Sequence, residues 1–277
     1  MALAKGGAVD TTRWLQRPEG RLAYDVVGDG ALVVCVPGMG DLRQTFRHLV
    51  PALVAGGYRV ATMDLRGHGE SAATFSSYDV PAAAEDLRAL IDALGGRAVV
   101  VGSSMGASAA ALLAAESPDR VAGLVLSGPF LGDGSMPGWK RMVFRLATAR
   151  PWAVAVWRAW LPKLYAGRTP GDHAAFLAQV FASLRLPGHA AAFARTTRSS
   201  HAGTEARLGD IRAPALVVMG TLDPDFPDPV GEASWAARAV RGDVLLVEEA
   251  GHYPLSQRPD VVAPAVLTFL ERVGHRA

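Results

Sequence analysis

The sequence has almost no cysteine, little excess charge and no long apolar run. It contains one cysteine, Cys35, in 277 residues, so no disulfide can form within the chain and a disulfide-stapled fold is excluded. The 28 lysines and arginines nearly balance 26 aspartates and glutamates, and the net charge of +2 supplies no bulk basic surface for nucleic acid. Half of the residues are hydrophobic, too many for a disordered chain. We expect a globular protein with a sizeable core and no nucleic-acid partner.

Continuous apolar segments are short. Residues 98–101 and 121–126 fall far short of the roughly 20 residues that a membrane span needs. Residues 1–14 include a lysine but no continuous apolar stretch, so they do not resemble a secretory signal. Together with the single thiol, these features predict a cytoplasmic protein without stable membrane insertion.

Short β-branched runs alternate with longer helical patterns. Apolar residues fill nearly every position of the runs, which is typical of strands in a parallel sheet that helices cover on both faces. The runs occupy residues 31–36, 58–63, 97–101, 121–126, 215–219 and 243–247, and residues 21–30 are typical of an extra edge strand. Helical patterns lie at residues 42–56, 80–94, 105–117, 229–240 and 259–273. This order predicts an α/β protein with a doubly wound, mostly parallel sheet.

The strand pattern stops between residues 127 and 212. This segment has prolines and tryptophans at helical spacing but no convincing strand. We interpret it as an inserted helical cap, which should lie over the carboxyl edge of the sheet, where open α/β folds bind ligands. The predicted division is a first core segment at residues 1–130, a cap at 131–210 and a second core segment at 211–277.

A candidate nucleophile lies between an apolar strand and an alanine-rich helix, in the pentapeptide Gly102-Ser103-Ser104-Met105-Gly106. The pattern G-x-S-x-G in this setting is typical of a nucleophile elbow, whose sharp turn leaves no room for side chains beside the serine and holds its hydroxyl outward. Only Ser104 has both glycines in register. The simpler alternative is a glycine- and serine-rich turn without a catalytic role.

A serine hydroxyl becomes a nucleophile when a histidine oriented by a carboxylate takes its proton. Of the seven histidines, only His252 follows a strand within a tight Gly-His turn late in the chain. The strand at 215–219 leads to Asp223 and Asp225, with Asp228 beyond, and we favour Asp223 because it is nearest the strand end. The alternative is that these aspartates form turns beside the neighbouring prolines.

The chain resembles the α/β-hydrolase superfamily over nearly its whole length outside the cap. The matching stretches are VPGMG (36–40), DLRGHGES (64–71), GSSMG (102–106), GTLDPDFP (220–227) and AGHYP (250–254). The resemblance implies the α/β-hydrolase fold with Ser104 as nucleophile, His252 as general base and then acid, and Asp223 as the orienting carboxylate.

By the same resemblance, two backbone N–H groups form an oxyanion hole. Met105, after the nucleophile, supplies one, and Met39, in the loop Pro37-Gly38-Met39-Gly40, supplies the other. Gly38 is expected to border the substrate. The family usually has His-Gly where this chain has Pro37-Gly38, which leaves the backbone donor in place but bears on how the loop is tethered.

The predicted cap is rich in basic and aromatic side chains. Residues 136–168 contain seven basic residues and no acidic one, together with Trp139, Trp152, Trp157 and Trp160. One interpretation is an electropositive pocket in which Trp139, Trp152 and Trp160 contact an acidic or amphiphilic substrate. A second is a lid that rests on a lipid surface. The simplest is that the tryptophans form the core of the cap beneath a solvated basic face.

Other candidate sites are weak. His68, in the RGHG segment, is expected to shape a turn rather than to act as a second base. No cluster of histidine, cysteine and carboxylate residues has the spacing of a metal site, and no phosphate loop or dinucleotide fingerprint is present. We therefore expect neither a metal nor a cofactor.

These residues favour a serine hydrolase that cleaves a small to medium apolar ester or lactone through an acyl-enzyme on Ser104. The same triad also serves carbon–carbon bond hydrolysis and cofactor-free perhydrolysis or haloperoxidation, and a slow-turnover ligand sensor would keep it too. A dehalogenase or epoxide hydrolase is disfavoured because those families have aspartate at the position of Ser104. Since His252 must start neutral, activity is expected to fall below about pH 6.5. The sequence carries no signal for the oligomeric state.

Overall fold

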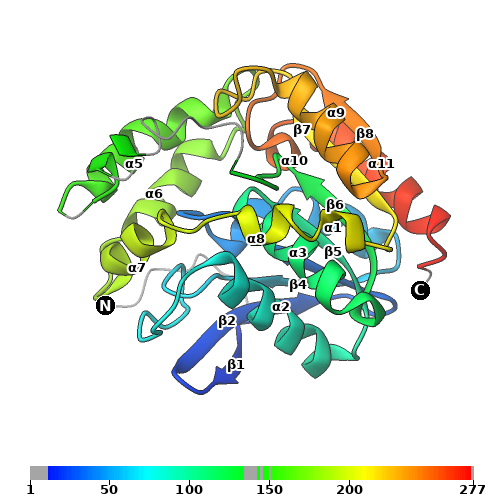
Figure 1. Cartoon of the computed structure of the whole chain (residues 1–277), viewed down its shortest axis with the longest axis horizontal. Coiled ribbons are helices and arrows are strands. Elements are labelled where there is room, and N and C mark those ends of the chain that lie inside the picture. Colours follow the sequence, from blue (N-terminus) through cyan, green and yellow to red (C-terminus); the bar gives the residue numbers. More distant parts are fainter. Residues whose placement is uncertain (1–11, 134–141, 144–145, 150, 276–277) are drawn as a thin grey trace.

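The central feature of the protein is an eight-stranded, mostly parallel sheet (Figure 1). The computed structural model describes residues 12–133, 142–143, 146–149 and 151–275. The strand order is β1-β2-β4-β3-β5-β6-β7-β8; β2 is antiparallel to both of its neighbours, and the other pairs are parallel. The strands are β1 (Arg13–Arg17), β2 (Gly20–Val27), β3 (Leu32–Val36), β4 (Arg59–Met63), β5 (Ala98–Ser103), β6 (Val121–Ser127), β7 (Ala215–Gly220) and β8 (Asp243–Val247).

The predicted fold class is confirmed, and each of the six apolar runs forms a strand. The predicted edge strand at 21–30 forms β2. The sequence analysis did not anticipate β1, which pairs with β2 as a hairpin at the sheet edge. Its sequence, RWLQR, has only two apolar residues and none of its side chains is fully buried, so it lacks the continuous apolar pattern of the inner strands.

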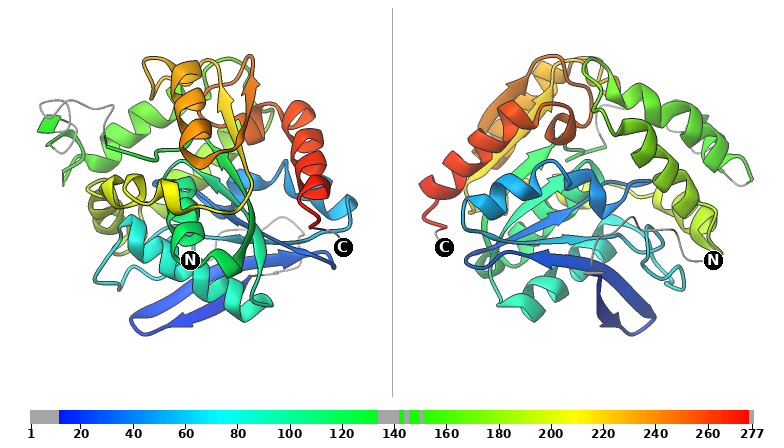
Figure 2. Two further views of the ribbon diagram at one scale, coloured as in Figure 1. Left: turned by 45° about the vertical axis from the view of Figure 1, so that its right-hand side comes forward. Right: turned by 180° about the vertical axis from the view of Figure 1, so that it is seen from behind.

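Successive residues of the inner strands point to two separate hydrophobic cores. In β3, Val34 and Val36 face one core, whereas Val33 and Cys35 face the other. Figure 2 shows the two layers of helices on opposite sides of the sheet. The first core is covered by α2 (Val80–Leu94), α3 (Met105–Glu116) and α9 (Pro229–Val240), and the second by α1 (Val50–Ala55) and α11 (Pro259–Arg272).

The described residues between β6 and β7 form helices joined by loops, with one isolated β-bridge between Gly167 and Ala250. Helices α5, α6 and α7 lie together beyond one side of the sheet (green to yellow-green in Figure 1). The elements of this segment are α5 (Ala153–Trp160), η3 (Leu161–Tyr165), α6 (His173–Ser183), α7 (His189–Thr196), α8 (Ala202–Glu205) and η4 (Leu208–Asp210). We call α5, η3, α6 and α7 the cap helices; the proposed cap boundaries at 131 and 210 stay a prediction.

The cap helices have a hydrophobic cluster of their own. Trp157, Phe176 and Phe193 pack there with Leu42 and Tyr253 from the sheet-bearing part of the chain. Leu42 follows β3 and Tyr253 follows β8, so the cluster attaches the cap helices to the carboxyl edge of the sheet. Three short helices complete the fold: η1 (Arg43–Phe46), η2 (Pro118–Arg120) and α10 (Pro254–Gln257). In the part of the chain that is described, no helix has the length and apolar character to cross a membrane.

Helix α3 begins in direct contact with the loop that follows β3. A Cβ atom built on Gly106 would collide with the carbonyl oxygen of Val36 and lie 2.5 Å from that of Pro37. A Cβ atom on Gly102 would lie 2.6 Å from Cα of Ala107. The two glycines therefore allow the backbone to fold tightly around Ser104.

This contact predicts that Gly106→Ala destabilises the protein. Because the colliding atoms are backbone, α3 must shift, and we expect the free energy of unfolding to fall by about 1–3 kcal/mol in urea titration. Gly203→Ala in α8 is the control, since a Cβ there meets nothing within 4 Å. Equal urea midpoints for Gly106→Ala and the wild type would contradict the close contact.

Candidate active site

Ser104 occupies a strained turn between β5 and α3. Its φ of 55° and ψ of −122° lie in a region that residues with side chains rarely adopt. Its N–H donates a 2.8 Å hydrogen bond to the carbonyl oxygen of Ser127 at the end of β6. The strand, turn and helix around Ser104 thus have the arrangement that the pentapeptide motif requires.

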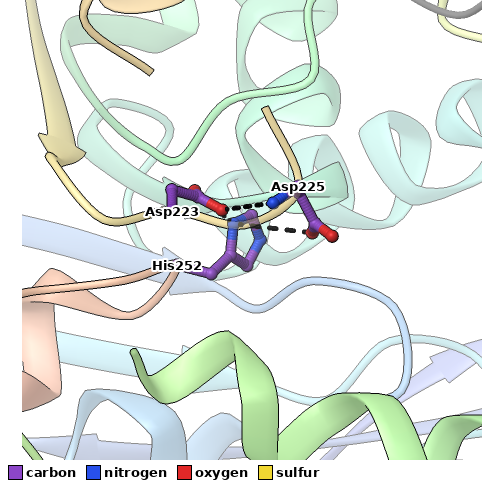
Figure 3. Close-up of side chains that lie close together, drawn as sticks. All are labelled: Asp223, Asp225 and His252. Atoms are coloured by element: carbon purple, nitrogen blue, oxygen red, sulfur yellow. Dashed lines mark hydrogen bonds and ion pairs between the residues drawn. The ribbon is translucent and has the colours of Figure 1, made fainter. Parts of the chain in front are cut away.

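His252 and Asp223 form a buried hydrogen-bonded pair (Figure 3). Asp223 lies in the loop after β7 and His252 in the loop after β8, and the imidazole Nδ1 lies 2.7 Å from Asp223 Oδ2. Asp225 is farther away, with its Oδ2 3.7 Å from Nδ1, and its N–H donates to Asp223 Oδ1 at 3.0 Å. Of the two candidate carboxylates, Asp223 is the one that binds the histidine directly.

Ser104 and His252 each contact the chain at the end of β6. The backbone of Ser127 binds Ser104, and a Cβ atom on the next residue, Gly128, would lie 3.0 Å from both Cε1 and Nδ1 of His252. No hydrogen bond joins Ser104 Oγ to His252 within the described part of the chain. Such bonds in active sites commonly tighten only in the substrate complex.

The pKa of His252 is strongly raised. Burial alone would lower it, but the charges of Asp223, Asp225 and Asp41, together with the hydrogen bond that Asp223 accepts from the ring, outweigh burial and raise the pKa to about 9. The surrounding carboxylates therefore favour the protonated ring. The expected fall of activity below about pH 6.5 assumed an ordinary histidine, and these carboxylates move the expected fall to higher pH.

The predicted oxyanion donors lie beside Ser104. A Cβ atom on Gly38 would lie 2.7 Å from Cβ and 3.2 Å from Oγ of Ser104, so only glycine leaves the nucleophile uncovered at this position. In the described structure, the N–H groups of Met39 and Met105 are paired with no acceptor. Both can therefore donate to an oxygen atom that approaches Ser104.

The loop of residues 37–40, which we call the oxyanion loop, is tethered at Gly40. The N–H of Gly40 donates to Nε2 of His68 at 2.9 Å, and Nδ1 of His68 lies 2.8 Å from the carbonyl oxygen of Arg66. Burial lowers the pKa of His68 to about 4, so the ring is neutral and its Nε2 accepts. On the other side of Gly40, the indole Nε1–H of Trp157 donates to the carbonyl oxygen at 2.9 Å. These bonds tether the loop that begins with Pro37.

A buried ion cluster fixes the chain just after the oxyanion loop. Arg43 is 3% exposed and contacts Asp25 at 2.7 Å, Glu70 at 2.5 Å and Asp64. Asp64 also accepts from the N–H of Arg43 at 2.8 Å. Burial raises the pKa of Asp64, and Arg43 opposes that shift. The cluster joins η1 to the 64–71 segment that carries His68.

The predicted substrate-contacting tryptophans occupy different environments. Trp160 reaches the active-site loops, because its Nε1–H donates to Oδ1 of Asp225 at 3.1 Å. Trp152 is 51% exposed, and its Nε1–H donates to the carbonyl oxygen of Leu146. Trp139 lies outside the described residues. The sequence analysis did not assign Trp157 to the site, although its spacing of three residues from Trp160 places both near one helical face.

Asp223, Asp225 and His252 are also the only group of three ligand-type side chains found in the described residues, with ligand atoms within 4.8 Å of one another. Sequence spacing did not reveal this group, because Asp223 and His252 are 29 residues apart in two loops. The Nδ1 atom of His252 is engaged by Asp223. The hydrogen bonds that Asp223 accepts from His252 and from the Asp225 N–H account for the closeness of the three side chains.

A model of the alpha/beta hydrolase family matches residues 33–265, a range that includes nearly all of β3 and the strands β4 to β8, the oxyanion loop, the Ser104 turn and the His252 loop but not β1 and β2. The chain belongs to the alpha/beta hydrolase family. The fold and this match agree with the resemblance that the sequence motifs indicate.

Relatives of this alpha/beta hydrolase carry names for several reactions. A Mycobacterium tuberculosis protein provisionally named non-heme bromoperoxidase BpoC is 31% identical over 274 residues, covering 91% of this chain and 98% of that protein. Epoxide hydrolase B of the same species is 38% identical over 115 residues, or 39% of this chain and 32% of that protein. A thermophilic esterase from Thermogutta terrifontis superposes with a TM-score of 0.78 at 24% identity, covering 95% and 98% of the two chains. Family membership therefore does not select the reaction.

The geometry predicts an unusual titration of His252. We expect a pKa near 9 when the imidazole is followed by NMR between pH 5 and 11. Asp225→Asn removes one of the neighbouring negative charges and should lower that pKa by about one unit. Asp228→Asn is the control, since Asp228 caps α9 and lies outside the carboxylate group around His252. A wild-type pKa near 6.5, or no shift in Asp225→Asn, would contradict this electrostatic description.

Proposed function

We propose that this alpha/beta hydrolase is a serine hydrolase that cleaves a carboxylic ester or lactone with a small to medium apolar portion. The observation that carries the proposal is the 2.7 Å hydrogen bond between Asp223 and His252, together with the strained turn that holds Ser104 between β5 and α3. The site thus offers a serine, an imidazole paired with a carboxylate, and the N–H groups of Met39 and Met105, which have no acceptor within the described structure. That set is what acyl transfer needs.

Acylation begins when Ser104 Oγ attacks the carbonyl carbon of the substrate and its proton passes to Nε2 of His252. Asp223 keeps Nδ1 of the ring protonated and stabilises the imidazolium that forms. The carbonyl oxygen becomes negative and receives hydrogen bonds from the N–H groups of Met39 and Met105. The tetrahedral intermediate then collapses, the carbon–oxygen bond breaks, and His252 returns the proton to the departing alcohol. In a lactone this alcohol stays attached to the acyl group.

Deacylation repeats these steps with water. His252 removes a proton from the water molecule, the hydroxide attacks the acyl carbon, and the same N–H groups hold the second oxyanion. Collapse releases the carboxylic acid and returns the proton to Ser104 Oγ. Loss of one oxyanion donor typically costs about 10²–10³ in turnover, so the tethers of the oxyanion loop bear directly on rate.

Aromatic side chains beside the triad support an apolar substrate. The ring of Phe130, just after β6, lies 5.9 Å from that of His252 and 4.8 Å from that of Phe226. Phe226 is buried and follows the two aspartates of the β7 loop. Binding of an alkyl or aryl group of the substrate against these rings is favourable, because it removes apolar surface from water.

A second candidate is cofactor-free perhydrolysis or haloperoxidation. It is favoured by the similarity to the bromoperoxidase-named BpoC over nearly all of that protein. The triad is the same, and the two reactions differ in whether water or hydrogen peroxide attacks the acyl group. Carbon–carbon bond hydrolysis and slow ligand sensing would also keep the triad. Epoxide hydrolysis is less well supported, because Ser104 stands where that reaction needs a carboxylate nucleophile.

Aryl esters from acetate to palmitate, together with simple lactones, test the proposal. We expect turnover by the wild type and a loss of at least about 10³-fold in Ser104→Ala, because the nucleophile is gone. Ser103→Ala is the matched control: the Oγ of Ser103 is buried and, among the described residues, has no hydrogen-bond partner. Equal rates for the wild type and Ser104→Ala would refute the esterase proposal, and peroxide-dependent bromination in the same assays would favour the second candidate.

The raised pKa of His252 predicts an alkaline pH profile. Only the neutral imidazole accepts the Ser104 proton, so kcat/KM should rise with pH and reach half its maximum near pH 9, the pKa in the free protein. The measurement is kcat/KM for an aryl ester from pH 5 to 10.5, corrected for spontaneous hydrolysis. A profile that is already flat above pH 7 would show that His252 titrates near its usual value.

A further inference from the structure

Helix α5 donates two indole hydrogen bonds to the two loops that carry the predicted chemistry. Trp157 Nε1–H binds the carbonyl oxygen of Gly40 at 2.9 Å, and Trp160 Nε1–H binds Oδ1 of Asp225 at 3.1 Å. Gly40 ends the oxyanion loop, and Asp225 lies 3.7 Å from the ring of His252. One short cap helix therefore contacts both halves of the site.

We propose that Trp157 and Trp160 form a clamp that assembles the active site when the cap helices are closed over it. In this clamp Trp157 positions the oxyanion loop, and Trp160 holds the Asp225 carboxylate beside His252. Both are positioning residues, because they act through other groups. The inference rests on the proposed serine hydrolase function and adds the residues that prepare its site.

Trp157 acts on the backbone next to the Met39 N–H. The Gly40 residue has a φ of 68°, and a Cβ atom there would lie 2.5 Å from Cε2 and Nε1 of Trp157. The indole thus packs directly on Gly40 while it binds its carbonyl oxygen, and His68 binds its N–H. With the peptide groups on both sides of Gly40 held, the preceding Met39 N–H has little freedom to turn away from Ser104.

Trp160 acts on the charge near His252. Burial raises the pKa of Asp225, whereas the charge of His252 and the hydrogen bond from Trp160 favour its ionised form. The ionised carboxylate in turn favours protonated His252. Without the indole N–H, Asp225 should be protonated more readily, and the pKa of His252 should fall.

The clamp links the entry of substrate to the ordering of the two active-site loops. Ser104 is 6% exposed and His252 1% exposed, so little of either side chain is open to solvent while the cap helices are in this position. Movement of α5 breaks both indole hydrogen bonds and releases the two loops together. Closure over a bound substrate restores them, which confines the fully ordered site to the closed state.

The test replaces each indole by a benzyl group, which removes the N–H and keeps a ring. For Trp157→Phe we expect kcat to fall about 10-fold with little change in KM and no shift in the pH profile, because an oxyanion donor is misplaced but not removed. For Trp160→Phe we expect the kcat/KM profile to move to lower pH by about half a unit, with kcat at pH 10 retained. Trp235→Phe in α9 is the control; in the described structure its indole N–H has no protein acceptor.

A double substitution distinguishes an effect of Trp160 on the pH profile through Asp225 from a general loss of stability. If Trp160 acts through Asp225, then Trp160→Phe should cause no further shift in the pH profile of the Asp225→Asn variant. Additive shifts would overturn the assignment. So would a Trp160→Phe profile that is unchanged or moved to higher pH, or a Trp157→Phe variant with wild-type kcat.

Two measurements without substrate keep the clamp testable if no ester is hydrolysed. Amide hydrogen exchange of residues 37–46 should accelerate in Trp157→Phe and not in Trp235→Phe, and NMR titration should show a lower His252 pKa in Trp160→Phe. If Trp157→Phe exchanged these amides at the wild-type rate and Trp160→Phe had the wild-type His252 pKa, the clamp would be refuted. Altered exchange and titration in a protein that hydrolyses none of the panel would refute only the esterase proposal.

Discussion

The hydrogen bond between Asp223 and His252 is the interaction around which the site is built. Both side chains are almost fully buried, and burying a charged pair is tolerated only when each partner is held in good geometry. The parallel sheet provides this geometry, because β7 and β8 end at the same edge and their loops lie side by side. At the neighbouring ends of β5 and β6, Ser104 binds the backbone of Ser127, and the next residue, Gly128, packs against the ring of His252. The order of the strands thereby places residues far apart in sequence within one site.

Much of this arrangement could be predicted from sequence because it depends on local patterns. Apolar β-branched runs identify the inner strands, and the two glycines around Ser104 identify a turn that no side chain could enter. The choice of Asp223 over Asp225 follows from its place at the strand end. By contrast, the electrostatics of His252 arise from the packing of three loops, and no spacing rule encodes them. The β1 strand was missed because an edge strand needs little apolar sequence.

The contacts that tether the oxyanion loop also could not be predicted from sequence patterns. At the position where the resemblance leads us to expect a histidine, Pro37 has no side-chain donor or acceptor. Here His68, Trp157 and the Arg43 cluster hold the loop and the chain that follows it, and they come from three separate segments. His68 was expected only to shape its own turn. Its contact with Gly40 depends on how two loops from neighbouring strands, β3 and β4, pack at one sheet edge.

The charge state of His252 has a consequence for product release. The neighbouring carboxylates favour the protonated ring, so His252 keeps its positive charge to a higher pH than an ordinary histidine does. In the proposed reaction each turnover ends with a carboxylate, an anion, beside that ring. Near neutral pH the acid product would then compete with fresh ester for the resting protein. As the medium becomes more alkaline the ring loses its proton, and retention of the product would weaken.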